Sequence, residues 1–204
     1  MCIRDSPYIK AYDPAFAYEV AAIMRHGLIE MYGEDPQDLV YYLTLYNEPL
    51  VQPARSEVTD EEILRGIYQY RAAPASGRSA TVLFSGSSAV EALAAADVLE
   101  RDHGVGVALY SVTSYKSLRE DAQAACRAGT MSVVERVLKD APGPLVAVSD
   151  YVTLLPDQIS PFLDRSLRVL GTDGVGMSDS REALRAHFGN DAASIVTAVL
   201  EELS

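Results

Sequence analysis

From residue 81 onward, short apolar runs alternate with stretches of helical periodicity, and this alternation constrains the fold more than any other feature. The apolar runs predict strands at residues 81–84, 107–112, 145–149 and 167–170. The periodic stretches predict helices at residues 89–102, 132–139, 156–163, 180–188 and 192–203. Strands that alternate with helices pair in parallel through right-handed crossovers. We therefore expect an α/β fold with an open, mostly parallel sheet and helices on both faces.

The first 71 residues carry a different pattern. Asp13 followed by Pro14 predicts a helix start, and the apolar period after it predicts an amphipathic helix ending at Gly33. Residues 39–45 form a continuous apolar run and predict a buried, parallel strand. Residues 61–70 fit either a short helix or a strand-like return.

Residues 72–80 (AAPASGRSA) are small and polar, which is typical of a linker. We place a domain boundary there, with one unit at residues 7–71 and a second at residues 81–204. Residues 1–6 (MCIRDS) share no pattern with the rest of the chain, and we interpret them as a non-native leader.

Composition excludes several functions. With 17 Lys and Arg against 29 Asp and Glu, the net charge is −12, which disfavours nucleic acid and anionic membranes. The sequence has no apolar run of spanning length and no secretion signal, so we expect a cytoplasmic protein. Two cysteines, Cys2 and Cys126, cannot make a disulfide framework, and the three scattered histidines predict no metal site.

Two glycine-bearing loops come directly after predicted strands. Residues 86–88 (GSS) lie where a strand meets a helix, and a tight turn with a helix cap is favoured there over a phosphate site. A nucleotide-binding enzyme remains a third hypothesis, which depends on that loop. Residues 170–176 (LGTDGVG) lie at the carboxyl end of the last strand, where open sheets place ligands and partner contacts, although a structural loop is the default interpretation.

Several segments, in order, resemble the homodimeric pyruvate dehydrogenase component of bacterial 2-oxo acid dehydrogenase complexes, a transketolase-like family. In the first unit they are residues 12–20 (YDPAFAYEV), 27–34, 41–48 and 65–68; in the second they are residues 104–106, 110–114 (YSVTS), 170–174 (LGTDG) and 178–182 (SDSRE). The resemblance covers about residues 8–203. It implies that residues 7–71 end a pyrimidine-binding-type middle domain and that residues 81–204 form a transketolase carboxy-terminal-like domain.

The resemblance also implies a chemistry for the parent protein. That enzyme, an oxidoreductase, decarboxylates pyruvate on thiamine diphosphate with Mg and reductively acetylates lipoyl groups of an acyltransferase core, as a homodimer. The Gly-Asp-Gly motif for metal and diphosphate is absent here, as is the segment with the activating glutamate. Leu45 stands where transketolases carry a sugar-phosphate-binding arginine, which favours a 2-oxo acid substrate. We therefore expect an inactive fragment with a structural and dimerisation role and no complete cofactor site.

No catalytic residue is predicted in this fragment. By the resemblance, Tyr46, Asn47 and Glu48 lie near the mouth of the substrate channel; a strand-end turn explains them equally well. A fragment should also expose apolar surface and self-associate. The alternative hypothesis is a free-standing, non-catalytic protein-interaction module with the same sheet.

Overall fold

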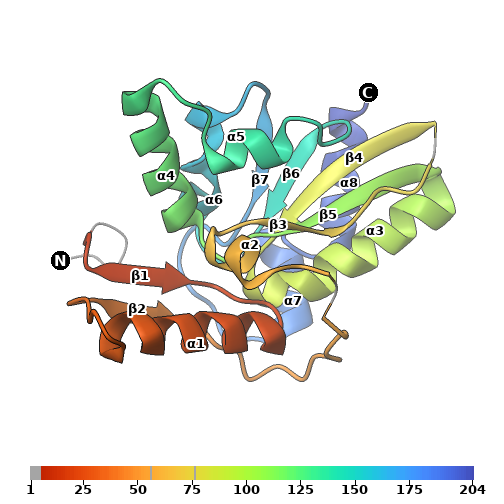
Figure 1. Cartoon of the computed structure of the whole chain (residues 1–204). Helices are drawn as coiled ribbons and strands as arrows, with labels where there is room; N and C mark the ends of the chain where they lie inside the picture. Colours follow the sequence, from red (N-terminus) through yellow and green to blue (C-terminus); the bar gives the residue numbers. More distant parts are fainter. Residues whose placement is uncertain (1–5, 56, 76) are drawn as a thin grey trace.

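The computed structural model describes residues 6–55, 57–75 and 77–204. It contains a two-stranded sheet, β1-β2, and a five-stranded sheet in the order β3-β5-β4-β6-β7 (Figure 1). The strands are β1 (Ile9–Tyr12), β2 (Val40–Leu43), β3 (Tyr68–Arg71), β4 (Arg78–Phe84), β5 (Val105–Ser111), β6 (Leu145–Val148) and β7 (Leu167–Leu170). All neighbouring pairs run parallel except β3 and β5.

Helices cover both faces of the larger sheet. The helices are α1 (Ala17–Tyr32), α2 (Asp60–Leu64), α3 (Ala89–His103), α4 (Tyr115–Ala128), α5 (Val133–Leu138), α6 (Leu154–Asp157), α7 (Arg181–Phe188) and α8 (Ala192–Glu202), with short 3-10 turns at Gly86–Ser88 and Ser160–Phe162. Helices α3 and α8 pack on one face, while α4 and α5 pack on the other. The predicted α/β class, with an open and mostly parallel sheet, is confirmed.

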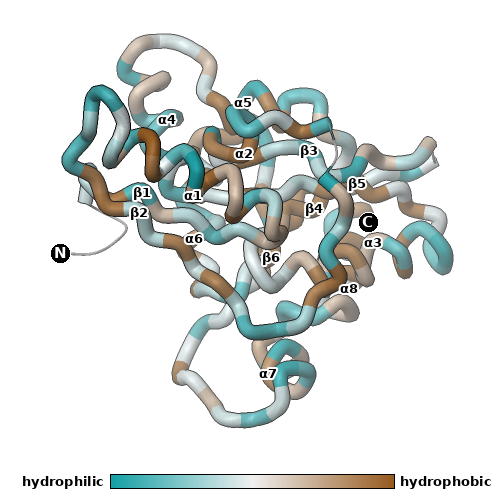
Figure 2. Tube along the Cα trace, turned by 60° about the horizontal axis from the view of Figure 1, so that its bottom comes forward, coloured by the Kyte–Doolittle hydropathy of each residue, from teal (hydrophilic) through white to brown (hydrophobic). Residues whose placement is uncertain are grey.

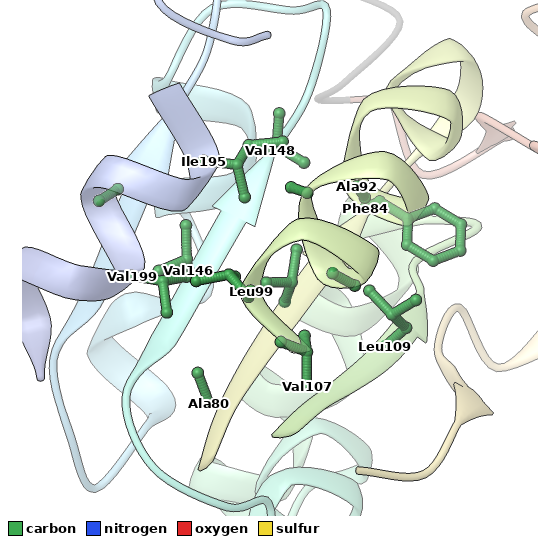
Figure 3. Packing of buried hydrophobic residues seen from close by; sticks show 14 of the residues in the cluster. Ala80, Phe84, Ala92, Leu99, Val107, Leu109, Val146, Val148, Ile195 and Val199 are labelled. Atoms are coloured by element: carbon green, nitrogen blue, oxygen red, sulfur yellow. The ribbon is translucent and has the colours of Figure 1, made fainter. Parts of the chain in front are cut away.

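The central strands are buried on both faces, which explains their unbroken apolar runs. Successive side chains point to opposite faces. Phe84 and Leu109 therefore join the cluster under α3 and α8 (Figure 3), and Leu83 joins the cluster under α4. Complete burial of one such side chain stabilises the fold by about 1.5–3 kcal/mol.

Helix ends in the second unit agree with the sequence signals. Helix α3 ends at Gly104, whose φ of +61° is the left-handed conformation that glycine adopts without strain. Ser180 caps α7 by accepting a hydrogen bond from the amide of Ala183.

The predicted start of the first helix is wrong. Helix α1 begins at Ala17, three residues after Pro14. The carboxylate of Glu19 reaches back to accept hydrogen bonds from the amides of Ala15 and Phe16, at 2.6 and 2.9 Å. A glutamate in the first turn thus provides the cap that we assigned to Asp13.

Strand β2 is parallel to β1 as predicted, but it is not buried. Val40 is 56% exposed and Tyr42 is 41% exposed. The reason is that Tyr41 and Leu43 pack in the cluster under α1, whereas Val40 and Tyr42 point to the opposite face of the two-stranded sheet. Both interpretations of residues 61–70 are realised in part, because α2 and β3 occupy that range. Strand β1 and helix α4 were not predicted.

The predicted domain division stays a prediction. Strand β3 precedes the proposed linker at residues 72–80, yet it pairs with β5 in the larger sheet. Residues 1–5 of the proposed leader lie outside the described residues. No helix in the described part of the chain is long and apolar enough to cross a membrane.

Backbone hydrogen bonds attach the first unit to the carboxyl edge of the larger sheet. The amide of Asp13 donates to the carbonyl of Thr113 at 2.7 Å, and the amide of Gly86 donates to the carbonyl of Asp13 at 3.1 Å. The residue that follows β1 is therefore held at the ends of β4 and β5.

Candidate functional site

The larger sheet has a topological switch point between β4 and β6. From β4 the chain crosses to β5 on one side, and it later returns to β6 on the other side of β4. The loops that leave β4 (residues 85–88) and β6 (residues 149–151) therefore diverge and leave a crevice at the carboxyl edge. Open parallel sheets bind ligands at this position.

Tyr46, Asn47 and Glu48 all line a cavity of about 280 Å³ at this edge. Other lining residues come from the sheet loops and from α7, among them Ser87, Asp150, Thr172, Arg185 and Asn190. Helix α7 stands away from the sheet layers at the end of a long loop (Figure 2). The structure thus brings the three predicted residues together, as one wall of a cavity whose other walls were not predicted.

Arg185 is the electrostatic centre of this cavity. Its side chain is 10% exposed and donates to Glu48 at 2.8 Å and to Glu91 of α3 at 3.0 Å; a carboxylate oxygen of Asp150 lies 3.9 Å away. Burial lowers the pKa of Arg185, but the hydrogen bond to Glu48 and the three carboxylates outweigh it and raise the pKa. Arg185 therefore stays charged and ties the segment after β2 to α3 and α7.

Asn190 closes the floor of the cavity. It is 2% exposed, and its amide nitrogen donates to the carbonyl of Ser149 at 3.4 Å, to Asp150 at 3.4 Å and to the hydroxyl of Thr172 at 3.2 Å. The hydroxyl of Ser87 donates to the second oxygen of Asp150. These contacts fix the ends of β4, β6 and β7 relative to one another.

The glycine-rich loop at residues 170–176 lies beside this floor. Asp173 accepts hydrogen bonds from the amide and hydroxyl of Thr153, at 2.9 and 2.6 Å, and these bonds lower the pKa of Asp173. A Cβ on Gly171 would lie 2.6 Å from the carbonyl oxygen of Tyr151, so only glycine permits this close approach. The loop thus supplies one rim of the cavity, with Gly176 and Met177 in its lining.

A second polar cluster surrounds Asp13. One of its carboxylate oxygens accepts from the hydroxyls of Thr44 at 2.6 Å and Tyr46 at 2.5 Å. Burial raises the pKa of Asp13, against the hydrogen bonds from Thr44, Tyr46 and Ser85. Gly86 has φ of +52°, and a Cβ there would lie 2.6 Å from the Asp13 carboxylate. The turn at residues 86–88 therefore admits this carboxylate only because residue 86 is glycine.

That arrangement removes the basis for a phosphate site at residues 86–88. The amide of Gly86 already donates to Asp13, and that of Ser88 donates to Ser85. The Asp13 side chain occupies the space against the turn, and the carboxylate of Asp150 beside it would repel a phosphate. The structure favours the tight-turn interpretation and opposes the nucleotide-binding hypothesis.

Sequence reasoning missed Arg185, Asn190, Asp150 and Asp13. One signal was available: Arg181 and Arg185 lie four residues apart on one helical face, which is unfavourable unless acidic groups from elsewhere approach them. In the structure Arg181 donates to Asn47 and Arg185 pairs with Glu48. Within the described residues, no group of three or more His, Cys, Asp or Glu side chains could hold a metal ion.

Comparison with protein families decides the relationship. Residues 66–191 match the model of the "Transketolase-like TK C-terminal domain", which is more than half of the chain. The chain belongs to the transketolase-like C-terminal domain family. Residues 2–53 of this family member match a second model, the "Pyruvate dehydrogenase E1 component middle domain". The predicted resemblance is confirmed.

Two curated relatives share one description. The chain is 46% identical over 210 residues to the pyruvate dehydrogenase E1 component of Mycolicibacterium smegmatis, covering 98% of this chain and 22% of that protein. It is 42% identical over 207 residues to that of Escherichia coli K12, covering 97% of this chain and 23% of that protein. This transketolase-like chain therefore spans less than a quarter of the length of these relatives.

Solved structures support the fold alone, because their sequence identities are low. Transketolase from Leishmania mexicana aligns with a TM-score of 0.67 and 20% identity, covering 98% of this chain and 26% of that chain. A split gene transketolase, described as an inactive beta4 tetramer, aligns with a TM-score of 0.59 and 18% identity, covering 98% of this chain and 60% of that chain.

Proposed function

We propose that this chain is the carboxy-terminal part of a thiamine-diphosphate-dependent pyruvate dehydrogenase E1 enzyme, located in the cytoplasm. In that enzyme, pyruvate is decarboxylated and lipoyl groups of an acyltransferase core are reductively acetylated. The observation that carries the proposal is the pairing of the two family matches in one chain, with 46% identity to an E1 component over 98% of its length.

The chain's own role in this proposal is structural. Residues 7–71 would end the middle domain, residues 81–204 would form the carboxy-terminal domain, and together they would contribute to a homodimer. The carboxylate of Asp150 opposes a diphosphate at the sheet edge, and the described residues offer no acidic cluster for Mg²⁺. The residues present do not fit thiamine diphosphate with its metal, so that cofactor would depend on other segments of the parent enzyme.

Tyr46, Asn47 and Glu48 are proposed to shape the entrance to the substrate channel. Their support is local: all three line one cavity, and Arg185 and Arg181 hold Glu48 and Asn47 in place. In this role they position the channel wall and make no contact with reacting atoms.

The test is pyruvate-dependent reduction of ferricyanide by the full-length parent protein and by the 204-residue chain, each with thiamine diphosphate and Mg²⁺. We expect activity from the parent and none from the chain. A parent that binds the cofactor but does not oxidise pyruvate would overturn the proposed reaction. Activity of the chain alone would overturn its structural role.

The free-standing interaction module is the second candidate. Apolar side chains are exposed on α1 and β2, including Leu28 and Val40 at 56% each. Such a surface favours a covering partner whether the chain is part of an E1 enzyme or a free-standing module. The mass of the native polypeptide in the source cells distinguishes the two. An immunoblot band several times heavier than 22.1 kDa supports the E1 proposal, and a band at 22.1 kDa supports the module.

A further inference from the structure

Tyr46 belongs to the walls of two neighbouring cavities. One is the cavity of about 280 Å³ at the carboxyl edge of the larger sheet. The other, of about 240 Å³, lies between the start of α1 and the segment after β2. Tyr46, Glu48 and Ser87 line both cavities, whereas Phe16 and Leu50 line only the second. Tyr46 is 39% exposed, so close packing covers only part of its side chain.

The side chain of Asp13 holds the far end of Tyr46. The hydroxyl of Tyr46 donates to one carboxylate oxygen of Asp13 at 2.5 Å, and the hydroxyl of Thr44 donates to the same oxygen at 2.6 Å. A carboxylate oxygen accepts two hydrogen bonds through its two lone pairs, so both bonds form together. This role does not require a charge, because a carboxyl group protonated on its other oxygen still accepts through this one.

Asp13 is itself fixed to the larger sheet. Its amide donates to the carbonyl of Thr113 at 2.7 Å, and its carbonyl accepts from the amide of Gly86 at 3.1 Å. The Tyr46 hydroxyl and the Asp13 carboxylate both lie against the turn that follows β4, because a Cβ on Gly86 would be 2.5 and 2.6 Å from them. The carboxylate is therefore a fixed point at the sheet edge to which a side chain from the segment after β2 is attached.

We propose that Asp13 is a positioning residue for the substrate channel, because its carboxylate fixes the ring of Tyr46 in the wall shared by the two cavities. This inference rests on the proposed function, in which Tyr46 shapes the channel entrance. The other two residues proposed there, Asn47 and Glu48, are held by arginines of α7. A Tyr46 ring released from Asp13 can turn into either cavity and narrow the entrance. Binding of pyruvate would then weaken, while the reacting atoms would be unaffected.

Steady-state kinetics of the full-length parent enzyme test this, with pyruvate varied and ferricyanide reduction measured. Tyr46→Phe removes the hydroxyl and keeps the ring. We expect it to raise the KM for pyruvate about threefold to tenfold, through loss of one hydrogen bond, and to change kcat by less than about twofold. Asp38→Asn, at an exposed position, should leave both constants unchanged. An unchanged KM in Tyr46→Phe, or a fall in kcat alone, overturns the positioning role.

Two substitutions at Asp13 separate positioning from folding. Asp13→Asn retains a carbonyl oxygen as acceptor and should keep KM within about twofold of the native value. Asp13→Leu, of similar size, removes the acceptor and should raise KM at least as much as Tyr46→Phe does. Equal impairment of the two Asp13 variants overturns the acceptor role, and Tyr46→Phe decides the matter if Asp13→Leu does not fold. A native parent that does not oxidise pyruvate overturns the proposed function, whereas an active parent with unaffected variants overturns only this inference.

Discussion

The carboxylate of Glu19 in α1 accepts a hydrogen bond from the hydroxyl of Ser111 in β5 at 2.6 Å, across 92 residues of sequence. The same oxygen accepts from Tyr68 of β3 at 2.6 Å, while the other oxygen accepts from the backbone amides of Ala15 and Phe16. One buried side chain thus joins the first unit to the larger sheet and also caps its own helix.

We predict a pH-dependent stability from Glu19. Burial raises its pKa in the folded chain above the ordinary 4.5, despite its hydrogen bonds to Ser111 and Tyr68. The contribution of a group with a raised pKa is fully present below 4.5 and is lost as pH rises through the folded value. Urea unfolding from about pH 4.5 to 8 should therefore show the advantage of the native chain over Glu19→Gln shrinking with pH. A stability difference between the native chain and Glu19→Gln that does not change with pH would contradict this. The control is Glu57→Gln, at an exposed position.

We predict that Arg185→Ala destabilises the chain by about 3 kcal/mol, because it leaves the Glu48 and Glu91 carboxylates partly buried without a counter-charge. Exposed Arg181→Ala on the same helix should change stability by less than about 0.5 kcal/mol. Thermal and urea unfolding measure both. Equal effects would mean that the cavity charges are solvated and that Arg185 is no electrostatic centre.

Gly86→Ala should be severely destabilising, and Gly104→Ala only mildly so. Both glycines have positive φ, +52° and +61°, so alanine at either site is unfavourable by about 1–2 kcal/mol. At Gly86 the new methyl would also meet the Tyr46 hydroxyl at 2.5 Å, whereas Gly104 has nothing within 4 Å. The extra loss of unfolding free energy in Gly86→Ala, relative to Gly104→Ala, measures the clash with Tyr46. Equal losses would mean that the Tyr46 hydroxyl does not lie against Gly86 in solution.

The isolated chain should self-associate through α1. Met24, Leu28 and Tyr32 form an exposed stripe along this helix at 53%, 56% and 76% exposure. The double variant Met24→Glu, Leu28→Glu should shift the chain toward monomer in light scattering after gel filtration. Val175→Glu, Met177→Glu adds the same charge at another exposed apolar site and should have little effect. A native chain that is already monodisperse and monomeric would refute this prediction.

Local patterns were sufficient for much of the second unit. Strands β4, β5 and β6 appeared as apolar runs because buried parallel strands need apolar side chains on both faces. Helix α4 was missed because it offers few large apolar residues: Leu118 is buried, but much of its inner face is alanine, such as Ala122 and Ala125. Strand β1, Ile9–Tyr12, is short and carries a lysine, so no run marks it.

The candidate site was less accessible to sequence reasoning. Resemblance indicated Tyr46, Asn47 and Glu48, which meet in one cavity. Arg185 joins them from a position 137 residues beyond Glu48, through a tertiary contact that no local spacing encodes. Asp13 was assigned to a helix cap because Asp before Pro is a common start signal, and the competing acceptor, Glu19, lies at the equally favourable third helical position.

The antiparallel pairing of β3 with β5 has a consequence for any attempt to divide the protein. Strand β3 occupies the outer edge of β5, although it precedes the small, polar stretch at residues 72–80. A cut in that stretch would remove β3 from the sheet. The backbone amides and carbonyls on that edge of β5, a long apolar strand, would then have no partner strand. Such an edge templates strand addition from other molecules. A carboxy-terminal piece prepared for study should therefore begin before Gly66, or it will polymerise through its own sheet.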